Sequence, residues 1–589
     1  MKYNILVNIL DGIRKEALDD YKFYNPENDD IEKINNARAK ALIHLFLKVK
    51  FGLINFKDRE ELFVTDGIND GGIDGYYIDG DNKEIYMIQA KFRTNETNFE
   101  RKEITYEDLL KMDISRITEG LTEDEEGNKY NGKIQRLIRG ISEISDIPKW
   151  KYRIVIMANI KEEKRKQIKK ITDKFEDILI FNHEKIYQEL VYPVVSGSFY
   201  NASELNISLN VSNKNASVIE YDVDTELDTC NITVCFVPTL EIAKIIYKYK
   251  NSILKYNPRS YLDLANNTVN SEIKKTIIGK ESNEFALFNN GITILSDETD
   301  YSTKSGRKNS AILSLKCPQI INGGQTAFTL GRIYEELLQD DKDTNIFDNK
   351  EVMLKVITFD NDTVLDENKK RDLIESISKA TNQQTYVSDA DRRSNDSVLI
   401  KIQKYFYEIF GIFLERKRGE FGDGVKNKYI DRNLIIEREV LLRVALSVSG
   451  QVYETKTSDK QIYTENNLKR LFDVSDNTLN KYIFSYKTYI KLGTFDSDDI
   501  DQYGYSLRYG KYAVTYVVSR MFDKDWGVLE YDTKINEFIE PILKNWIEFE
   551  AFAQNEDSEK KYFSDKMLNF VNYYKGRTLN RDLKNYFDV

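Results

Sequence analysis

The chain has few of the residues that build several common kinds of site. Its 589 residues include two histidines, His44 and His183, which argues against histidine-based catalysis and against a histidine-rich zinc centre. The three cysteines, Cys230, Cys235 and Cys317, form neither a CxxC pair nor another zinc-knuckle spacing. We therefore interpret them as reduced thiols, which is typical of a cytosolic protein.

Long apolar runs and targeting signals are also missing from the sequence. No apolar run approaches the length of about 18 residues that a membrane-spanning helix needs, so we expect no membrane span. The first residues lack the long apolar core of a signal peptide, so we expect a cytoplasmic protein. The phosphate-binding pattern Gly-x-x-x-x-Gly-Lys-Ser/Thr does not occur either, which disfavours a P-loop motor.

The charge balance is acidic, with 97 Asp and Glu residues against 86 Lys and Arg residues and a net charge of −11. This excludes a uniformly basic nucleic-acid binder but leaves room for a local basic groove. The chain is 41% apolar and 12% aromatic, which is enough for real hydrophobic cores. Its length suits roughly three or four domains.

Residues 65–93 contain side chains that are suited to catalysis, and they predict a glycine-rich loop followed by a β-hairpin. Residues 76–78 are β-prone, Asp-Gly-Asp-Asn at 79–82 is strong turn sequence, and residues 84–92 alternate as strands do. This register places Asp74 opposite roughly residue 88. Gln89 and Lys91 are two apart, so they share one face of the strand. An acid, an amide oxygen and an ammonium group therefore converge.

This combination suits metal-assisted cleavage of phosphodiester bonds. Asp74 can bind Mg²⁺ or Mn²⁺ through oxygen, and the Gln89 side-chain oxygen and the carbonyl of residue 90 can complete the ligand set. Lys91 can hold or deprotonate the attacking water, or offset charge that develops on the phosphate. The alternative is an ordinary hairpin with a solvated aspartate and lysine.

The sequence Gly-Ile-Asp-Gly followed by Ile-Gln-Ala-Lys resembles the PD-(D/E)xK nuclease superfamily, in the Mrr-like variant with glutamine in place of the second acid. The resemblance implies that Asp74, Gln89 and Lys91 are catalytic and that Asp74 and Gln89 are metal ligands. Such nucleases carry a further acid on the helix before the hairpin, and Glu32 is the candidate. Asp66 and Asp70 either hold a second metal or stabilise the loop, and the second role is favoured.

The fold class that we predict is α/β, or α+β, in three parts. Residues 1–195 form a PD-(D/E)xK-like domain, residues 205–435 a mixed α/β domain, and residues 436–589 a mainly helical region. Within the first part we expect helices over 4–21, 31–50 and 161–174, a helical stretch over 104–145 with a turn at Gly127 after the acidic cluster at 123–126, and strands over 151–159 and 177–181. Asn28 or Asp29 is expected to cap the helix at 31–50, and His44 is expected to be a packed residue of that helix.

The central part contains two loops rich in glycine and asparagine, at 289–293 and 322–326. The second opens onto a predicted helix, whose first backbone N–H groups attract anions. Further on come Ala-Thr-Asn-Gln-Gln at 380–384 and a basic, aromatic stretch at 413–421, a composition that suits phosphates and bases. The alternative is two tight turns and a surface hairpin.

These four segments, in this order, resemble the abortive-infection phage-resistance family, AIPR, over roughly residues 55–435. The resemblance implies a role in defence against phage. The expected nucleic-acid or ligand contacts are Asn290, Gly291, Asn322, Gly323, Gly324, Gln325, Thr326, Asn382, Gln384, Arg416, Lys417 and Arg418.

The leading hypothesis is an Mg²⁺- or Mn²⁺-dependent endonuclease in phage defence, with DNA favoured over RNA as its partner. One alternative is a catalytically silent sensor that binds nucleic acid or another ligand. Another is a toxin that cleaves RNA at the same site. A phage-derived trigger and assembly into a homo-oligomer are left open by the sequence.

Overall fold

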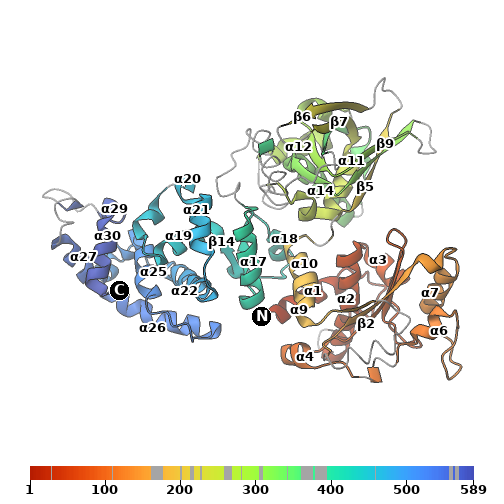
Figure 1. Cartoon of the computed structure of the whole chain (residues 1–589), viewed down its shortest axis with the longest axis horizontal. Coiled ribbons are helices and arrows are strands. Elements are labelled where there is room, and N and C mark those ends of the chain that lie inside the picture. The colour runs from red at the N-terminus through yellow and green to blue at the C-terminus, as the bar shows by residue number, and fades with distance from the viewer. Residues whose placement is uncertain are drawn as a thin grey trace. The chain divides into compact units, whose positions relative to one another are not determined.

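The computed structural model describes residues 1–27, 30–105, 107–108, 111–160, 177–198, 200, 202–211, 218–225, 229–257, 268–279, 282–303, 309–340, 342–359, 376–377, 394–457, 459–555, 562–563 and 570–588. The chain divides into two compact units. Unit one consists of residues 1–374 and 419–432, and unit two of residues 375–418 and 433–589. The mixed α/β class with a helical C-terminal region, predicted from the sequence, is confirmed (Figure 1).

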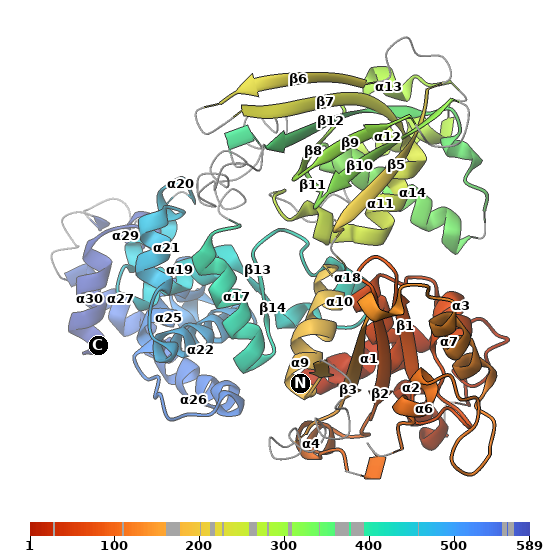
Figure 2. The ribbon, with the colours of Figure 1, turned by 45° about the vertical axis from the view of Figure 1, so that its right-hand side comes forward.

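Unit one begins with a four-stranded sheet in the order β1-β2-β3-β4 (Figure 2). Its strands are β1 (Gly75–Asp79), β2 (Glu84–Ala90), β3 (Lys151–Met157) and β4 (Asp177–Ile180). β1 and β2 are antiparallel, and the other pairs are parallel. The hairpin forms as predicted because the carboxylate of Asp79 accepts hydrogen bonds from the backbone N–H groups of Asp81 and Asn82, which closes the turn.

Helices surround this sheet. They are α1 (Lys2–Arg14), α2 (Ile31–Phe51), α3 (Phe56–Asp58), α4 (Glu96–Arg101), α6 (Ile114–Thr118), α7 (Gly132–Ser142), α9 (His183–Ile186) and α10 (Tyr192–Ser196). One face of the sheet buries Tyr76, Ile85 and Met87 against apolar side chains of α6 and α7. α2 packs against β2, and the side chain of Ile43 lies so close to Gly75 that a Cβ atom there would clash with it.

Three predictions about this region need correction. The leading helix ends at Arg14, and Asp30 rather than Asn28 or Asp29 caps α2, by accepting a hydrogen bond from the N–H of Lys33. The stretch 104–145 contains much less helix than predicted, and the break extends well beyond the turn predicted at Gly127. A loop separates α6 from α7, because Gly120 and Gly127 adopt left-handed backbone conformations and Asn131 caps a new helix. The charged helix predicted over 161–174 lies outside the described residues.

The central part of unit one contains two further sheets, of order β5-β10-β9 and β11-β8-β12-β7-β6. The strands are β5 (Glu204–Asn210), β6 (Val218–Asp224), β7 (Thr229–Pro238), β8 (Ile292–Ser296), β9 (Thr299–Ser302), β10 (Ser310–Lys316), β11 (Gln319–Asn322) and β12 (Glu351–Phe359). The helices are α11 (Thr239–Tyr249), α12 (Thr268–Gly279), α13 (Phe285–Phe288) and α14 (Gly324–Gln339), while α18 (Gly422–Lys426) packs against α10. α11 and α14 contribute to a shared apolar core with β5, β8, β10 and β12.

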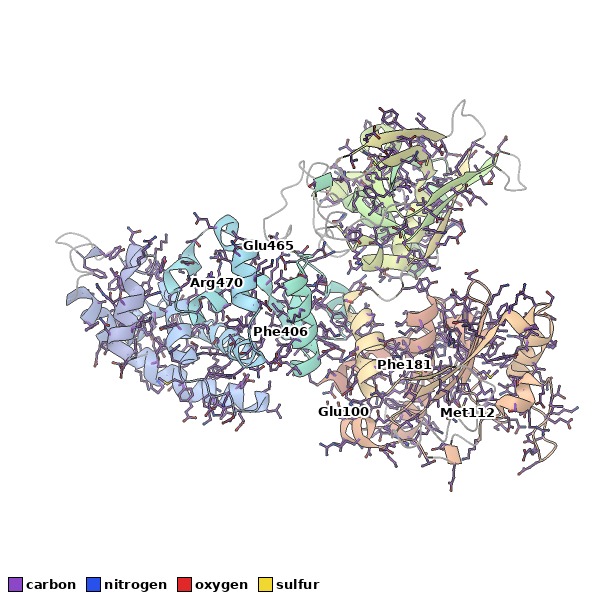
Figure 3. The ribbon with its side chains drawn as sticks, in the orientation of Figure 1. Glu100, Met112, Phe181, Phe406, Glu465 and Arg470 are labelled. Carbon is purple, nitrogen blue, oxygen red and sulfur yellow. The ribbon has the colours of Figure 1, made fainter. Side chains whose placement is uncertain are left out.

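Unit two is helical apart from a pair of short parallel strands, β13 (Phe413–Glu415) and β14 (Ile435–Glu437). Its helices are α17 (Ser397–Phe410), α19 (Arg438–Val448), α20 (Asp459–Ile462), α21 (Glu465–Phe472), α22 (Asp476–Leu492), α23 (Ile500–Tyr503), α24 (Ser506–Tyr509), α25 (Lys511–Ser519), α26 (Tyr531–Lys544), α27 (Trp546–Asn555), α29 (Phe570–Tyr573) and α30 (Thr578–Phe587). They enclose one large core, in which Phe406 of α17 is fully buried (Figure 3). Among the described helices, none combines the length and the apolar character needed to cross a bilayer.

Candidate metal-binding site at the first hairpin

The hairpin brings Asp74 against the end of β2. Gly75 lies opposite Ile88, and the N–H of Asp74 donates a 2.8 Å hydrogen bond to the carbonyl of Ile88. The Oδ2 atom of the Asp74 carboxylate accepts a 2.6 Å hydrogen bond from the N–H of Ala90, the last residue of β2. The register thus differs by one position from the predicted one, and it puts Asp74 level with Gln89.

Within the described part of the chain, the side-chain oxygen of Gln89 is buried and has no hydrogen-bond partner. The Tyr76–Met87 pairing implies that Asp74 and Gln89 project from the same face of the hairpin, because side chains alternate along both strands. Gln89 is only 3% exposed, and its Nε2 donates a 2.9 Å hydrogen bond to the carbonyl of Asp108. Its Oε1 is buried and accepts no hydrogen bond from any residue that the structure describes. An unsatisfied buried acceptor is costly unless a ligand completes it.

Two more carboxylates join Asp74. Oxygen atoms of Asp66, Asp70 and Asp74 all lie within 4.8 Å of one another. Asp70 also shapes the loop, since its carboxylate accepts hydrogen bonds from the N–H groups of Gly67 and Gly72 at 3.0 and 2.9 Å. The loop-stabilising role predicted for one of these residues therefore applies to Asp70. Asp66 and Asp70 also belong, with Asp74, to the cluster of three carboxylates.

Burial and neighbouring negative charges disfavour the ionised form of the Asp74 carboxyl. Burial raises the pKa of Asp74 to about 7, and the neighbouring charges of Asp66 and Asp70 act in the same direction. The hydrogen bond from Ala90 and the charge of Lys91 oppose this rise. Burial also raises the pKa of Asp66. A cation placed among these carboxylates would relieve the repulsion.

Lys91 lies beside an acid that sequence reasoning missed. Its Nζ is 3.4 Å from Oδ1 of Asp108, whose Oδ2 accepts a 2.8 Å hydrogen bond from the Thr105 hydroxyl. Thr105 and Lys91 thereby hold the pKa of the Asp108 carboxyl below its usual range, although burial acts against this. Asp108 is 17 positions beyond Lys91, and no spacing or motif in the sequence signals their contact.

The structure does not bring Glu32 to this site. Glu32 is exposed in the first turn of α2, eleven residues before Ile43, which marks where α2 passes Gly75. That separation corresponds to about 16 Å along the helix, farther than a glutamate side chain reaches. Among the described acids, Asp66 and Asp70 accompany Asp74 instead. His44 is a packed residue, as expected, and contacts Tyr24 and Glu60.

The donor set fits a hard divalent cation. Mg²⁺ and Mn²⁺ prefer oxygen ligands, and the hairpin offers carboxylate oxygens of Asp66, Asp70 and Asp74. On the same hairpin, no described residue donates a hydrogen bond to the buried Gln89 Oε1. Asp74 and Gln89 are therefore suitable ligands, and Asp66 and Asp70, for which the sequence favoured a loop-stabilising role over metal binding, extend the set.

The two central loops form one structural element. Asn289 donates a 2.9 Å hydrogen bond from Nδ2 to the hydroxyl of Thr326, and its Oδ1 accepts one from the N–H of Gly291. Gly323 has a φ of +78°, and a Cβ atom there would lie 2.6 Å from the carbonyl oxygen of Gly291. Gly323 is therefore required by the close approach of the two loops, whereas Gly291 is required by its closeness to Met353 of β12.

The other residues expected in the central loops differ in their surroundings. Asn290 is exposed, and Asn322 accepts a hydrogen bond from the N–H of Gly323. Gly324 begins α14, and Gln325 has a buried Nε2 atom without a hydrogen-bond acceptor among the residues that the structure describes. Asn382 and Gln384 lie outside the described residues.

The predicted basic patch at 416–418 is largely internal. Arg416 donates hydrogen bonds to the Gln403 side chain at 2.7 Å and to the Ser394 carbonyl at 2.9 Å, and Lys417 is only 7% exposed. Arg418 is about half exposed and faces Glu439 at 3.8 Å. Arg416 and Lys417 are thus not available as a surface for phosphates, because residues 413–415 form a strand that draws this stretch into the helical core.

Comparison with known proteins gives one match. The family model of the AIPR protein matches residues 254–554, which is just over half of the chain. The matched part contains the two central loops and most of the helical unit, and it excludes the hairpin site. No curated protein and no solved structure matches the chain.

Proposed function

The chain belongs to the AIPR family, and we propose that it is a metal-dependent nuclease that acts in abortive-infection defence against phage. The family itself points to anti-phage defence. The nuclease assignment depends on the hairpin site, and DNA is the proposed substrate. The observation that carries it is the Oε1 atom of Gln89, which is buried on the same face as Asp74 and has no hydrogen-bond partner among the described residues.

Each hairpin residue has a distinct task in this proposal. Asp74 and Gln89 hold the divalent cation, with Asp66 and Asp70 as further acidic neighbours. When bound, the cation supplies positive charge that stabilises a phosphate in the transition state. Ala90 fixes the Asp74 carboxylate through its N–H group, so one oxygen stays oriented before substrate arrives.

In this proposal Lys91 contacts the substrate and not the metal. It follows Gln89 by two residues, and its side chain is about one-third exposed, so the ammonium group can meet a phosphate oxygen from solvent. There it offsets negative charge that develops as the phosphodiester bond breaks. Asp108 keeps the ammonium group in place between turnovers.

The test is cleavage of supercoiled plasmid DNA and of total RNA by the full-length protein, with Mg²⁺, with Mn²⁺ and with EDTA. We expect metal-dependent cutting of DNA that falls about 100-fold or more in Asp74→Asn and Lys91→Ala. Asp81→Asn is the matched control, because it removes the same charge from the exposed turn of the same hairpin.

The outcomes separate the alternatives. Cutting of RNA alone, lost in the same variants, would identify an RNA-cleaving toxin. If Asp74→Asn and Lys91→Ala cut like the wild type, the site assignment is wrong. If the wild type binds Mn²⁺ and nucleic acid but cuts neither substrate, the protein is a binding sensor rather than an active nuclease.

A further inference from the structure

The larger central sheet ends in an open edge strand. β6 pairs with β7 on one side and is the last strand in the order β11-β8-β12-β7-β6 (Figure 2). Its outer backbone groups have no hydrogen-bond partner among the described residues. An edge of this kind is a template for another extended segment, and proteins usually protect it.

This edge carries exposed apolar side chains. Ile219 and Tyr221 on β6 are 62% and 68% exposed, and Phe236 on the neighbouring β7 is 39% exposed. Ile219 and Tyr221 share a face because they are two residues apart. Large apolar side chains gathered on an unpaired edge favour a binding surface over a solvated one.

The opposite face of the same strand is acidic. Glu220, Asp222 and Asp224 alternate with the apolar residues. Asp222 accepts a 2.9 Å hydrogen bond from Asn231, and Asp224 one from Thr229, but none of the three forms an ion pair with a described residue. Among the described residues, the negative charge of these three side chains is therefore not neutralised by an ion pair.

A groove extends this negative surface. It has a volume of about 730 Å³ and includes Asp222 of β6 together with Glu204, Asp297, Glu298 and Asp300. Lys316, which also lines the groove, is paired with Glu298. The acids of the groove and of β6 thus lie on one continuous acidic surface that meets the open edge at Asp222.

A second copy of the chain fits this edge poorly. In an antiparallel pair centred on Tyr221, Glu220 of each chain would lie opposite Asp222 of the other. Like charges that face each other across two strands are destabilising. The charges instead favour an occupant in which basic residues alternate with apolar ones.

We propose that the β6 edge binds an extended, cationic segment of a protein partner, which adds as a further strand. The partner's backbone completes the hydrogen bonds of β6, its lysines or arginines face Glu220 and Asp222, and its apolar side chains cover Ile219 and Tyr221. This inference is independent of the hairpin site and of the nuclease activity.

The experiment measures binding of three capped, fluorescent peptides of about nine residues to the full-length protein by anisotropy. One peptide alternates lysine with valine, one has the same composition with all lysines at one end, and one alternates glutamate with valine. We expect the alternating lysine peptide to bind about tenfold more tightly than the block peptide. Hydrogen exchange should show new protection at residues 218–224.

Charge reversal provides the matched variant. Glu220→Lys combined with Asp222→Lys alters two exposed side chains, so the fold should persist, as circular dichroism would verify. This variant should no longer bind the alternating lysine peptide and should bind the alternating glutamate peptide instead. Equal binding of alternating and block peptides, or equal binding by the variant, would overturn the proposal. So would a wild-type dimer that Ile219→Lys dissociates, because a second copy would then occupy the edge.

Discussion

The ammonium nitrogen of Lys91 lies 3.4 Å from a carboxylate oxygen of Asp108. The same aspartate accepts a 2.9 Å hydrogen bond from Gln89 through its backbone carbonyl. Asp108 therefore positions both a proposed metal ligand and the proposed phosphate-binding lysine. One contact uses its side chain and the other its backbone, so a substitution can separate them.

Asp108→Asn should remove the charge that orients Lys91 while it keeps the backbone bond to Gln89. We expect kcat for DNA cleavage to fall about tenfold with metal affinity unchanged, because Lys91 acts on the substrate and not on the cation. Measurement of kcat, KM and Mn²⁺ affinity in the same preparation checks this. A loss of Mn²⁺ affinity comparable to that of Asp74→Asn would show that Asp108 acts on the metal instead.

Gln89→Leu should weaken Mn²⁺ binding by about tenfold, because it removes a neutral oxygen ligand from the set. Stability in EDTA should change little, since the lost hydrogen bond to Asp108 is offset by removal of a buried acceptor that had no partner. Calorimetric titration with Mn²⁺ tests the expected loss of affinity, and denaturant unfolding in EDTA tests the expected stability. Unchanged Mn²⁺ affinity would exclude Gln89 as a ligand.

Metal binding should depend on pH through Asp74. Because its pKa is about 7 in the metal-free protein, the carboxyl must lose a proton before it can hold a cation. We expect Mn²⁺ affinity to be about tenfold weaker at pH 6 than at pH 8. Asp81→Asn should retain this dependence, and Asp74→Asn should bind weakly at both pH values. Equal affinities of the wild type at pH 6 and pH 8 would contradict the assignment.

The stability of unit two should depend on the buried carboxyl of Glu550. Burial raises its pKa from 4.5 to about 7, although the Tyr574 hydroxyl and the Tyr505 N–H donate hydrogen bonds to it. Between pH 4.5 and 7 the unfolded chain releases this proton and the folded chain keeps it. The free energy of unfolding therefore falls as pH rises through this range, by about 3 kcal/mol from this group.

Glu550→Gln should abolish that part of the pH dependence, because the amide remains neutral and can still accept a hydrogen bond. Denaturant unfolding of the wild type and the variant at pH 5 and pH 8 measures the difference. The variant should gain stability relative to the wild type at pH 8. A difference between the two proteins that does not change with pH would show that Glu550 does not titrate in this range.

Gly323→Ala should destabilise the central part of unit one by about 2 kcal/mol or more. The new Cβ atom would lie 2.6 Å from the Gly291 carbonyl oxygen at a backbone position with φ of +78°. Gly132→Ala is the control, because no heavy atom lies within 4 Å of its added Cβ and its φ is not in the left-handed region. Equal unfolding midpoints for the two variants would refute this account of the paired loops.

Local patterns in the sequence identified the elements whose geometry is set by near neighbours. The turn at 79–82 follows from Asp79 hydrogen bonds within three residues, and α2 from the spacing of its apolar side chains. Over 104–145 the same logic found the turn at Gly127 but missed the left-handed Gly120 and the cap at Asn131, which together lengthen the interruption between the helices.

The sequence by itself determined a mixed α/β chain with a helical C-terminal region, the first hairpin, and the proximity of Asp74 to Gln89, because two short strands joined by a tight turn leave little choice of register. Tertiary structure alone decided the membership of Asp66 and Asp70 in the site, the pairing of Lys91 with Asp108, and the exclusion of Glu32. It also joined the two central loops and buried Arg416 and Lys417. These outcomes depend on how loops and helices pack against a sheet. Such packing brings together residues that are far apart in the sequence, and no periodic pattern in the sequence indicates these contacts.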